Sequence, residues 1–322
     1  MKPIGILLLS GLFFLPLGNQ MGQANDFPSR PVEIIIGFAP GGTQDIAVRA
    51  MSDELSKNLG VPVIVTNKGG AGGVIAVEYV ASAKPDGYTI LIASNGQFNI
   101  LPLLTPGVHY KHSDFVTLCK YFTSPNLVVV RKASPYKSFR DIISDAKKNP
   151  GKLTCATPGF GTPGHFALEM IKIQAGIDIA HLPYKSGGEV NTSLLGGQVD
   201  FANQGLPPAM GLLKSGDLRG LATITFERLQ GFPDIPTMKE LDYPKAILDV
   251  WFAYFLPKGT PKPVIDKLAS VFEKTINTPN VKTNMESQGN VVGYQEGSTF
   301  GRFISEESKM LEEVAKKAKL IK

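Results

Sequence analysis

The residues whose types and spacing best suit ligand binding form a glycine turn at positions 38–45, with the sequence FAPGGTQD. The apolar run at 32–36 predicts a strand before the turn, and the spacing of apolar residues from Ile46 onward predicts a helix after it. Glycine lets a ligand approach the backbone, and the first turn of a helix carries unpaired N–H groups and the positive end of the helix dipole. The turn is therefore a candidate anion site, although the same residues also suit a helix start that binds nothing.

Two further glycine-rich turns, at 67–73 and 157–165, each follow a predicted strand and open a predicted helix. Neither has the G-K-[ST] of a P-loop, and neither is a G-x-G-x-x-G in a Rossmann setting, so a nucleotide ligand is not indicated. A carboxylate that backbone N–H groups hold needs no arginine beside it. These turns therefore predict a binding site for a small anion. Asp45 would repel that anion, and we expect it instead to accept hydrogen bonds from N–H groups of its own loop or from water.

The histidines and cysteines do not form a catalytic or metal-binding motif. The sequence contains no G-x-S-x-G or H-E-x-x-H motif, no CxxC and no Cys/His cluster. His165 is the one histidine on a glycine turn, where the helix dipole favours its neutral form. It could cap the turn or donate one hydrogen bond to a ligand, and an exported hydrolase that uses His165 with the hydroxyl of Thr162 stays open as an alternative. We predict no catalytic residue, no metal and no cofactor.

Three other residues of these types have structural roles in our interpretation. His181 lies within a predicted strand, where a hydrogen-bonded structural histidine is expected. Cys119 and Cys155 lie in apolar, strand-like segments, which predicts buried free thiols. A disulfide between them is the alternative, because export would permit one.

Composition and charge favour a globular protein that attracts small anions over one that binds nucleic acid. The chain of 322 residues is 43% hydrophobic and 19% charged, and it is long enough for one or two domains with full cores. The formal net charge is +5, but the basic residues are scattered and no basic block is interleaved with aromatic residues. A mild positive surplus would attract small anions at long range. We therefore expect no nucleic-acid partner.

The N-terminus predicts export. Lys2 precedes an apolar run at 4–17, and the sequence GQA at 22–24 places small residues at both positions that determine cleavage. We predict a signal peptide at 1–24 that is cleaved after Ala24. The apolar run is short for a membrane span, and no cysteine near the cleavage site indicates a lipid anchor.

The order of predicted elements indicates an α/β protein with two lobes. Strands and helices alternate from 32 to 93, which predicts a parallel sheet with right-handed crossovers, and a second unit of this kind follows. The tail after it has no new glycine turn and is expected to pack back onto the first unit. We therefore predict lobe 1 from residues 25–130 plus 250–322 and lobe 2 from residues 131–249. Two interdomain crossover strands would form a hinged cleft that suits capture of a small ligand.

Seven short segments, in this order and spacing, resemble the signature segments of the Bug family. They are 27–31 (FPSRP), 38–45 (FAPGGTQD), 70–73 (GAGG), 84–89 (KPDGYT), 183–187 (PYKSG), 195–200 (LGGQVD) and 257–261 (PKGTP). Bug proteins are the periplasmic substrate-binding components of tripartite tricarboxylate transporters. The match runs over nearly the whole mature chain. The resemblance implies a periplasmic solute-binding protein of the two-lobed Venus flytrap form, and not an enzyme.

The resemblance also implies a ligand, a partner and a set of contact residues. The ligand would be a small organic acid, held between the lobes by backbone N–H groups and ordered waters. The partner would be the membrane permease subunits of the transporter, and the protein itself a monomer; a sensor that presents its ligand to a membrane receptor is the alternative. The residues at the matching positions are Ala39, Gly42, Thr43, Asp45, Ser94 and Asn95 in lobe 1, and Gly161, Thr162, His165 and Tyr184 in lobe 2.

The sequence departs from the family pattern at four places. Gly69 stands where proline is usual, residues 163–164 (PG) where small hydroxylic residues or prolines are common, and residues 203–205 (NQG) where an aspartate is frequent. Phe160 adds an apolar surface beside the second-lobe loop. These changes fall where the distal part of a ligand would be recognised. We therefore expect a mono-, di- or aromatic carboxylate, and the residues alone do not choose among these.

Overall fold

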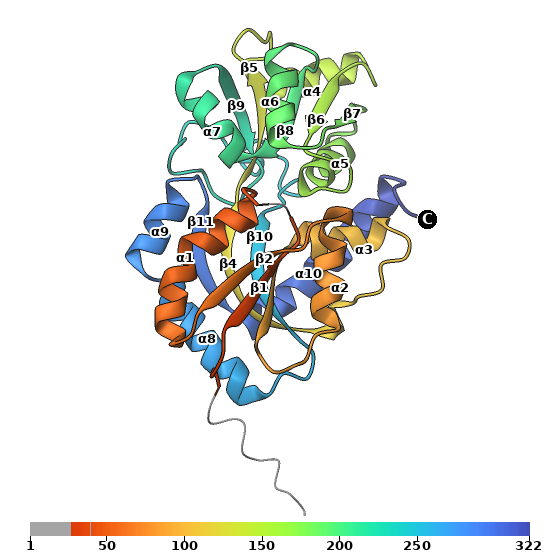
Figure 1. Cartoon of the computed structure of the whole chain (residues 1–322). Helices are drawn as coiled ribbons and strands as arrows, with labels where there is room; N and C mark the ends of the chain where they lie inside the picture. Colours follow the sequence, from red (N-terminus) through yellow and green to blue (C-terminus); the bar gives the residue numbers. More distant parts are fainter. Residues whose placement is uncertain (1–26, 39) are drawn as a thin grey trace, which may run out of the picture.

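Two β-sheets, one above the other in Figure 1, divide the chain into two lobes. The computed structural model describes residues 27–38 and 40–322, so the predicted signal peptide, its cleavage site and Ala39 lie outside the described residues. In these ranges no helix is both long and apolar enough to cross a membrane. The two-lobed α/β fold that the sequence predicts is confirmed.

The sheet of lobe 1 is mixed, with the strand order β11-β4-β10-β3-β1-β2. β1, β2 and β3 run parallel, as the alternating pattern predicts, whereas β10, β4 and β11 pair antiparallel with their neighbours. Successive side chains of β1 enter different cores, since Ile34 and Ile36 pack on one face of the sheet and Ile35 on the other. The strands are β1 (Val32–Ile36), β2 (Val63–Asn67), β3 (Thr89–Ser94), β4 (Phe115–Ser124), β10 (Val250–Pro257) and β11 (Val291–Glu296).

Helices cover both faces of this sheet. α1, α8 and α9 pack on the face of Ile34, while α2 and the first part of α10 pack on the face of Ile35. The segment after β3 is a π-helical turn, η2, that leads directly into α3. The elements are α1 (Thr43–Leu59), η1 (Ala71–Gly73), α2 (Val74–Ala81), η2 (Gly96–Ile100), α3 (Leu101–Leu104), η3 (His112–Asp114), α8 (Lys262–Ile276), α9 (Pro279–Glu286) and α10 (Gly297–Lys317).

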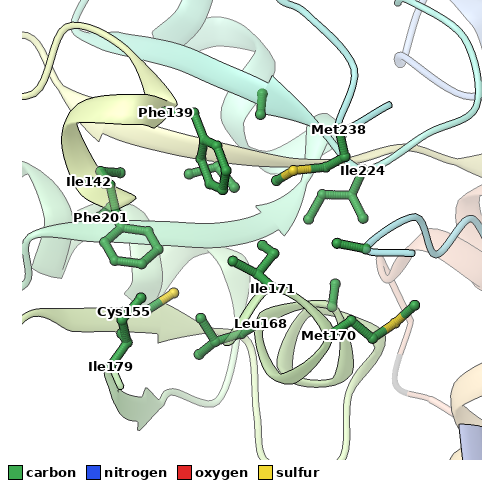
Figure 2. Packing of buried hydrophobic residues seen from close by; sticks show 14 of the residues in the cluster. Phe139, Ile142, Cys155, Leu168, Met170, Ile171, Ile179, Phe201, Ile224 and Met238 are labelled. Atoms are coloured by element: carbon green, nitrogen blue, oxygen red, sulfur yellow. The ribbon is translucent and has the colours of Figure 1, made fainter. Parts of the chain in front are cut away.

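The sheet of lobe 2 has the strand order β7-β6-β8-β5-β9. Figure 2 shows one of its cores, where Phe139 of α4 and Ile171 of α5 pack against Phe201 of β8. Helices α6 and α7 cover the opposite face. The elements are β5 (Asn126–Arg131), α4 (Phe139–Lys148), β6 (Thr154–Thr157), α5 (Pro163–Ala175), β7 (Ala180–Pro183), α6 (Gly187–Leu195), β8 (Phe201–Gly205), α7 (Leu206–Ser215) and β9 (Leu218–Thr223).

The first crossover lies earlier in the chain than the sequence pattern places it. β5 pairs with β8 and β9, so residues 126–131 belong to the second sheet and not to lobe 1. The sequence places a crossover in this strand and ends lobe 1 at residue 130, because an apolar strand carries no sign of the sheet that it will join. We propose the lobe boundaries at Pro125, between β4 and β5, and just before Val250, where β10 returns to the first sheet.

The C-terminal helix α10 contacts both lobes, whereas the sequence predicts that the tail packs onto lobe 1. Phe300 and Ile304 lie in a core of lobe 1, but Leu311 and Ala315 join the core of lobe 2. A helix of 21 residues is about 30 Å long, which is enough to span the junction. Figure 1 accordingly shows the C-terminus at the level where the two lobes meet.

Cys119 and Cys155 are buried free thiols, as predicted. They lie in β4 and β6, strands of different sheets, so a bond between them is not available. Burial raises the pKa of both thiols well above the usual range, which makes them unreactive.

Candidate ligand-binding site

The loop before α1 leaves the start of this helix without a side-chain cap. Gly41 adopts a left-handed conformation, with φ of +82°, and Gly42 is the N-cap residue, with no side chain to accept from the first turn. The N–H groups of a first helical turn have no partner within the helix. Gly42 and Thr43 therefore present backbone donors at the positive end of the α1 dipole, which is the arrangement that the sequence predicts for an anion site.

Asp45 supports this loop from the inside. Its carboxylate is 4% exposed and accepts hydrogen bonds from the Gly41 N–H at 2.9 Å, from Asn67 Nδ2 at 3.1 Å and from Arg49 Nε at 3.0 Å. Asn67 also donates to the carbonyl of Phe38 at 2.9 Å. The hydrogen bond from Arg49 is the main cause of a lowered pKa at Asp45, so the carboxylate is ionised and paired.

The end of β3 brings Ser94 and Asn95 to the junction of the lobes. Both are buried, and the turn that follows is the π-helical η2 and not the simple polar turn that the sequence predicts. π-helical turns are frequent at functional sites. Gln97 of this turn accepts from the Ser94 N–H at 3.2 Å and from Gln44 Nε2 at 2.5 Å, so it fixes the end of β3 to the first turn of α1.

The second glycine turn makes room for Gln97. A Cβ atom on Gly37 or on Gly73 would lie 2.4 Å from Gln97 Nε2, so only glycine fits at either position. Gly73 also has φ of +101°, a left-handed conformation that favours glycine. The glycines of this turn therefore have a packing role, which the sequence alone did not separate from anion binding.

The second-lobe loop is closed by its own side chains. Thr162 is the N-cap of α5, where it accepts from the His165 N–H at 3.4 Å and donates to the Gly159 carbonyl at 2.8 Å. The Gly161 N–H donates to His165 Nδ1 at 3.1 Å. Thr162 and His165 therefore hold the loop, and the N–H of Gly161 already has a partner.

His165 is a neutral, buried imidazole inside a stack of rings. It is 2% exposed and lies between Phe160 and His181, with ring centroids at 4.8 Å and 4.1 Å. Burial is the first cause that lowers the pKa of His165 to about 3 and that of His181 to about 4. Because Nδ1 accepts from Gly161, the proton is on Nε2, which lies 3.9 Å from Glu169 Oε1, too far for a hydrogen bond.

This geometry gives no support to a hydrolase. The Thr162 hydroxyl bonds the backbone of His165 and the Gly159 carbonyl, and the acceptor nitrogen of the imidazole is occupied by Gly161. A general base needs a free acceptor within reach of the nucleophile's proton. His181, in turn, contacts Thr157 Oγ1 at 2.7 Å through Nε2, which confirms its structural role.

Tyr184 joins the ends of two neighbouring strands of lobe 2. Its N–H donates to the Thr157 carbonyl at 2.9 Å, and its half-buried hydroxyl lies 2.5 Å from Ser193 Oγ. The hydroxyl therefore has a partner in its own lobe, whereas the sequence suggested only a bond to a ligand.

The two lobes approach each other at these loops. A Cβ atom on Gly96 would lie 3.4 Å from Pro163 Cδ, and one on Gly161 would lie 3.1 Å from Leu104. The end of β3 therefore lies against the start of α5. All the predicted contact residues that the structure describes lie on loops or element ends where the two sheets face each other, while Ala39 lies outside the described residues.

Buried amides without a complete set of partners lie at the end of β8 and directly after β3. Asn203 donates to the Gly164 carbonyl at 2.9 Å and Gln204 donates to Asn191 Oδ1 at 2.7 Å, which fixes the orientation of both amides. Their oxygens, and Oδ1 of Asn95, have no partner among the described residues. Buried polar atoms are nearly always hydrogen-bonded, so these oxygens are candidate acceptors for a ligand hydroxyl or for water.

A separate cavity of about 620 Å³ lies between the lobes beside the crossover strands. It is lined by Lys120, Met210, Phe226, Asp249 and Asn290, with neighbours from both lobes, and none of the predicted contact residues lines it. Its charges are mixed, with lysine, arginine and carboxylate side chains together, so it does not resemble an anion site. In the described residues no group of three or more His, Cys, Asp or Glu side chains could hold a metal ion.

Comparison with known proteins decides the family. A family model described as "Tripartite tricarboxylate transporter family receptor", TctC, matches residues 47–320. The chain belongs to the TctC family. The protein BugT of Bordetella pertussis is 32% identical over 287 residues, which cover 88% of each chain. A relative from Cupriavidus necator, described as "UPF0065 protein in gbd 5'region", is 34% identical over 318 residues, or 99% of this chain and 96% of that one.

Solved structures of TctC-type proteins share the fold. The periplasmic binding protein BugD is 30% identical, with a TM-score of 0.78, and the match covers 91% of this chain and 99% of BugD. An R. palustris protein with adipate is 30% identical, with a TM-score of 0.81 and coverage of 91% and 98%. MatC of Rhodopseudomonas palustris, with bound malate, is 28% identical, with a TM-score of 0.78 and coverage of 89% and 99%. The resemblance to the Bug proteins is thus confirmed, and members of the TctC family are solute-binding receptors, not enzymes.

Proposed function

We propose that this protein is a periplasmic receptor that captures an organic carboxylate between its lobes and delivers it to the permease of a tripartite tricarboxylate transporter. The observation that carries the proposal is the uncapped start of α1, where Gly42 and Thr43 present backbone donors over a braced loop. Family membership and the malate- and adipate-bound relatives support the ligand class. The predicted signal peptide and the periplasmic relatives support the location.

In this proposal the first lobe holds the carboxylate. Its oxygens would accept hydrogen bonds from the first-turn N–H groups of α1, at the positive end of the helix dipole. The negative charge of Asp45 does not oppose this, because Arg49 pairs with it at 3.0 Å. Ser94 and Asn95, at the end of β3, would border the same carboxylate.

The second lobe would recognise the rest of the ligand. Phe160 is 58% exposed on its loop and offers an apolar surface, as does Phe38, which is 41% exposed on lobe 1. The oxygens of Asn203 and Gln204 would accept bonds from ligand hydroxyls or from bridging waters. Thr162 and His165 would act by holding the loop, and Tyr184 by joining the ends of β6 and β7.

Calorimetric titration with a panel of carboxylates tests the proposal. The panel contains malate, adipate and benzoate, with the corresponding primary amides as matched controls of the same size. We expect at least one acid to bind and to raise the unfolding temperature, while its amide does neither. A panel without any binding acid would contradict the proposal, as would equal binding of acid and amide.

Delivery needs its own test. Uptake of the binding acid by membrane vesicles that contain the permease subunits should require the loaded receptor. If the acid binds but uptake proceeds equally without the receptor, the protein would instead fit the sensor that the sequence left open as an alternative.

A further inference from the structure

Glu307 is a buried carboxylate at the point where α10 passes from one lobe to the other. It is 6% exposed, and it lies between Ile304 in a core of lobe 1 and Leu311 in the core of lobe 2. Trp251 Nε1 donates to its Oε2 at 2.8 Å, and Asn99 Nδ2 donates to the same oxygen at 2.7 Å. Glu307 forms no salt bridge with a described residue. The carboxylate thus depends on neutral donors alone.

The other oxygen of Glu307 lies beside one predicted contact residue, Asn95. Asn95, a predicted contact residue, is fully buried and directs Nδ2 toward the Asp249 carbonyl at 2.9 Å and toward Glu307 Oε1 at 3.5 Å. A single buried amide therefore separates this carboxylate from the end of β3. A ligand carboxylate bordered by Ser94 and Asn95 would approach Glu307 with like charge.

Burial makes the ionisation state of Glu307 sensitive near neutral pH. It is the main cause that raises the pKa of Glu307 to about 7, with a smaller contribution from the charge of Asp249 and against the effect of the hydrogen bonds of Glu307. Burial also raises the pKa of Asp249 to about 6, while Lys120 on β4 opposes that shift. On the elements packed around it, Glu169 of α5 pairs with Lys172 at 3.0 Å, and Glu306 of α10 is exposed.

We propose that Glu307 couples carboxylate binding to proton uptake. A ligand carboxylate at the end of β3 and an ionised Glu307 behind Asn95 repel each other, so the occupied cleft favours protonated Glu307. The proton comes from solvent and is placed on Oε1, because Oε2 already accepts two short hydrogen bonds. The affinity for carboxylates therefore falls as the pH rises through about 7. This inference rests on the proposed function, because it needs a carboxylate in the cleft.

Glu307→Gln tests the coupling, since the amide keeps one oxygen for Trp251 and Asn99 but has no charge. Malate and adipate serve as probes, because both are mostly doubly ionised from pH 6 to 8.5 and contribute little to the pH dependence themselves. We expect wild-type affinity to be about sevenfold weaker at pH 8.5 than at pH 6, the change that follows if the ligand raises the pKa of Glu307 from about 7 by about one. In Glu307→Gln the affinity should change less than about twofold. Glu312→Gln, an exposed residue of the same helix that pairs with Lys316, is the matched control and should keep the wild-type profile.

The single tryptophan gives a direct readout. Trp251 donates to Glu307, so its fluorescence should titrate with a midpoint near the pKa of about 7, and saturating malate or adipate should raise this midpoint. The titration should be absent in Glu307→Gln. An unchanged midpoint with bound ligand would overturn the coupling, as would a pH-dependent affinity that persists in the variant.

Wild-type protein alone gives a third measurement, which is independent of how well a variant folds. Calorimetry in buffers of different ionisation enthalpy should detect uptake of a fraction of a proton per ligand at pH 7. Binding without proton uptake would overturn the coupling and leave the proposed function intact. If no acid of the panel, benzoate included, binds at any pH, the proposed function fails and the coupling falls with it, while the ligand-free titration of Trp251 still reports on Glu307.

Discussion

The loops at 38–45 and 157–165 have the same sequence signal but differ in how the first turn of the following helix is capped. Both are glycine turns that open a helix, and from the sequence we expected both to contact one ligand between the lobes. Before α1, the N-cap is Gly42, which has no side chain to accept from the first N–H groups of the helix. Before α5, the N-cap is Thr162, whose hydroxyl accepts from the His165 N–H. The glycine before each N-cap is held in the same way, since the Gly41 N–H donates to Asp45 and the Gly161 N–H donates to His165. In the proposed function, this difference assigns the hydrogen-bond donors to lobe 1 and the fit around the rest of the ligand to lobe 2.

The loops differ equally in electrostatics. Lobe 1 places an ionised but paired carboxylate, Asp45 with Arg49, beneath the free helix start. Lobe 2 places a neutral His165 within a stack of rings. A change in lobe 1 should therefore alter affinity through charge and backbone donors, and a change in lobe 2 should act through the order of the loop.

The largest effect is expected from Gly42→Val. At φ −78° and ψ 168° the backbone of Gly42 suits any residue, so the fold should be retained, but the new side chain would occupy the place of the carboxylate. We expect affinity for the best acid of the panel to fall by about a hundredfold or more, equal to about 2.7 kcal/mol. Calorimetric titration measures this loss, and Gly211→Val, on an exposed and open position of α7, is the control. Unchanged affinity in Gly42→Val would remove the start of α1 from the site.

Arg49→Ala should have the next largest effect on binding. The substitution leaves the charge of Asp45 without its cation beside the anion site. Because Arg49 is 52% exposed, solvent screens this charge, and we expect affinity to fall only roughly fivefold. The double variant Asp45→Asn, Arg49→Ala removes the charge together with its partner and should recover most of the loss. If the double variant binds no better than Arg49→Ala, Asp45 acts on affinity through loop geometry and not through charge.

His165→Asn tests the loop of lobe 2 through stability and pH. In the folded protein the pKa of His165 is lowered to about 3, whereas an unfolded histidine titrates near its ordinary value of 6.5. The unfolded chain therefore binds more protons, so the free energy of unfolding should fall as the pH decreases below 6.5 toward 3. Urea unfolding at a series of pH values from about 7.5 down to about 4.5 measures this slope, which should become shallower in the variant.

The same variant separates a positioning role from a ligand contact. The side-chain oxygen of the introduced asparagine can still accept from the Gly161 N–H, so affinity at neutral pH should weaken only about threefold, or about 0.6 kcal/mol. A loss as large as that of Gly42→Val would show that the imidazole touches the ligand, as the sequence first allowed.

The smallest effect is expected from Tyr184→Phe. The hydroxyl already lies 2.5 Å from Ser193 Oγ, so its removal should lower the free energy of unfolding by about 1 kcal/mol and change affinity less than about twofold. Ser193→Ala should lower stability by a similar amount, and a double-mutant cycle measures the coupling of the pair. An affinity loss of about fivefold in Tyr184→Phe alone would place its hydroxyl on the ligand.

Much of the fold was accessible from the sequence because its signals are local. The alternation of apolar segments predicts the parallel strands β1, β2 and β3, and Ser138 with Asp141 forms the capping box that begins α4. β11 was missed, because it is a half-exposed edge strand that pairs only with β4 and contains Gly293. The sheet or core that an apolar strand or helix face joins also depends on distant parts of the chain. For this reason the sequence did not predict the sheet of β5 or the contact of the second half of α10 with lobe 2.

In the candidate site, too, the local signals could be predicted from the sequence and the contacts between distant residues could not. Glycine turns marked the loops at 38–45 and 157–165, but not the groups that hold them in place. Asn67 and Gln97 come from other elements, and only Arg49, four residues after Asp45 on one helix face, had a spacing that could have been noticed. Gly73 leaves space for the side chain of Gln97, and no local sequence pattern encodes this contact.

The helix α10 changes what kind of joint the molecule has. Two crossover strands alone would let lobe 2 both swing and twist about lobe 1. Because Leu311 and Ala315 are anchored in the core of lobe 2 while Phe300 and Ile304 are anchored in lobe 1, the helix acts as a brace across that joint. Any rotation of one lobe against the other would therefore have to bend α10 or move one of these two anchors, which limits how the loops of the two lobes can separate.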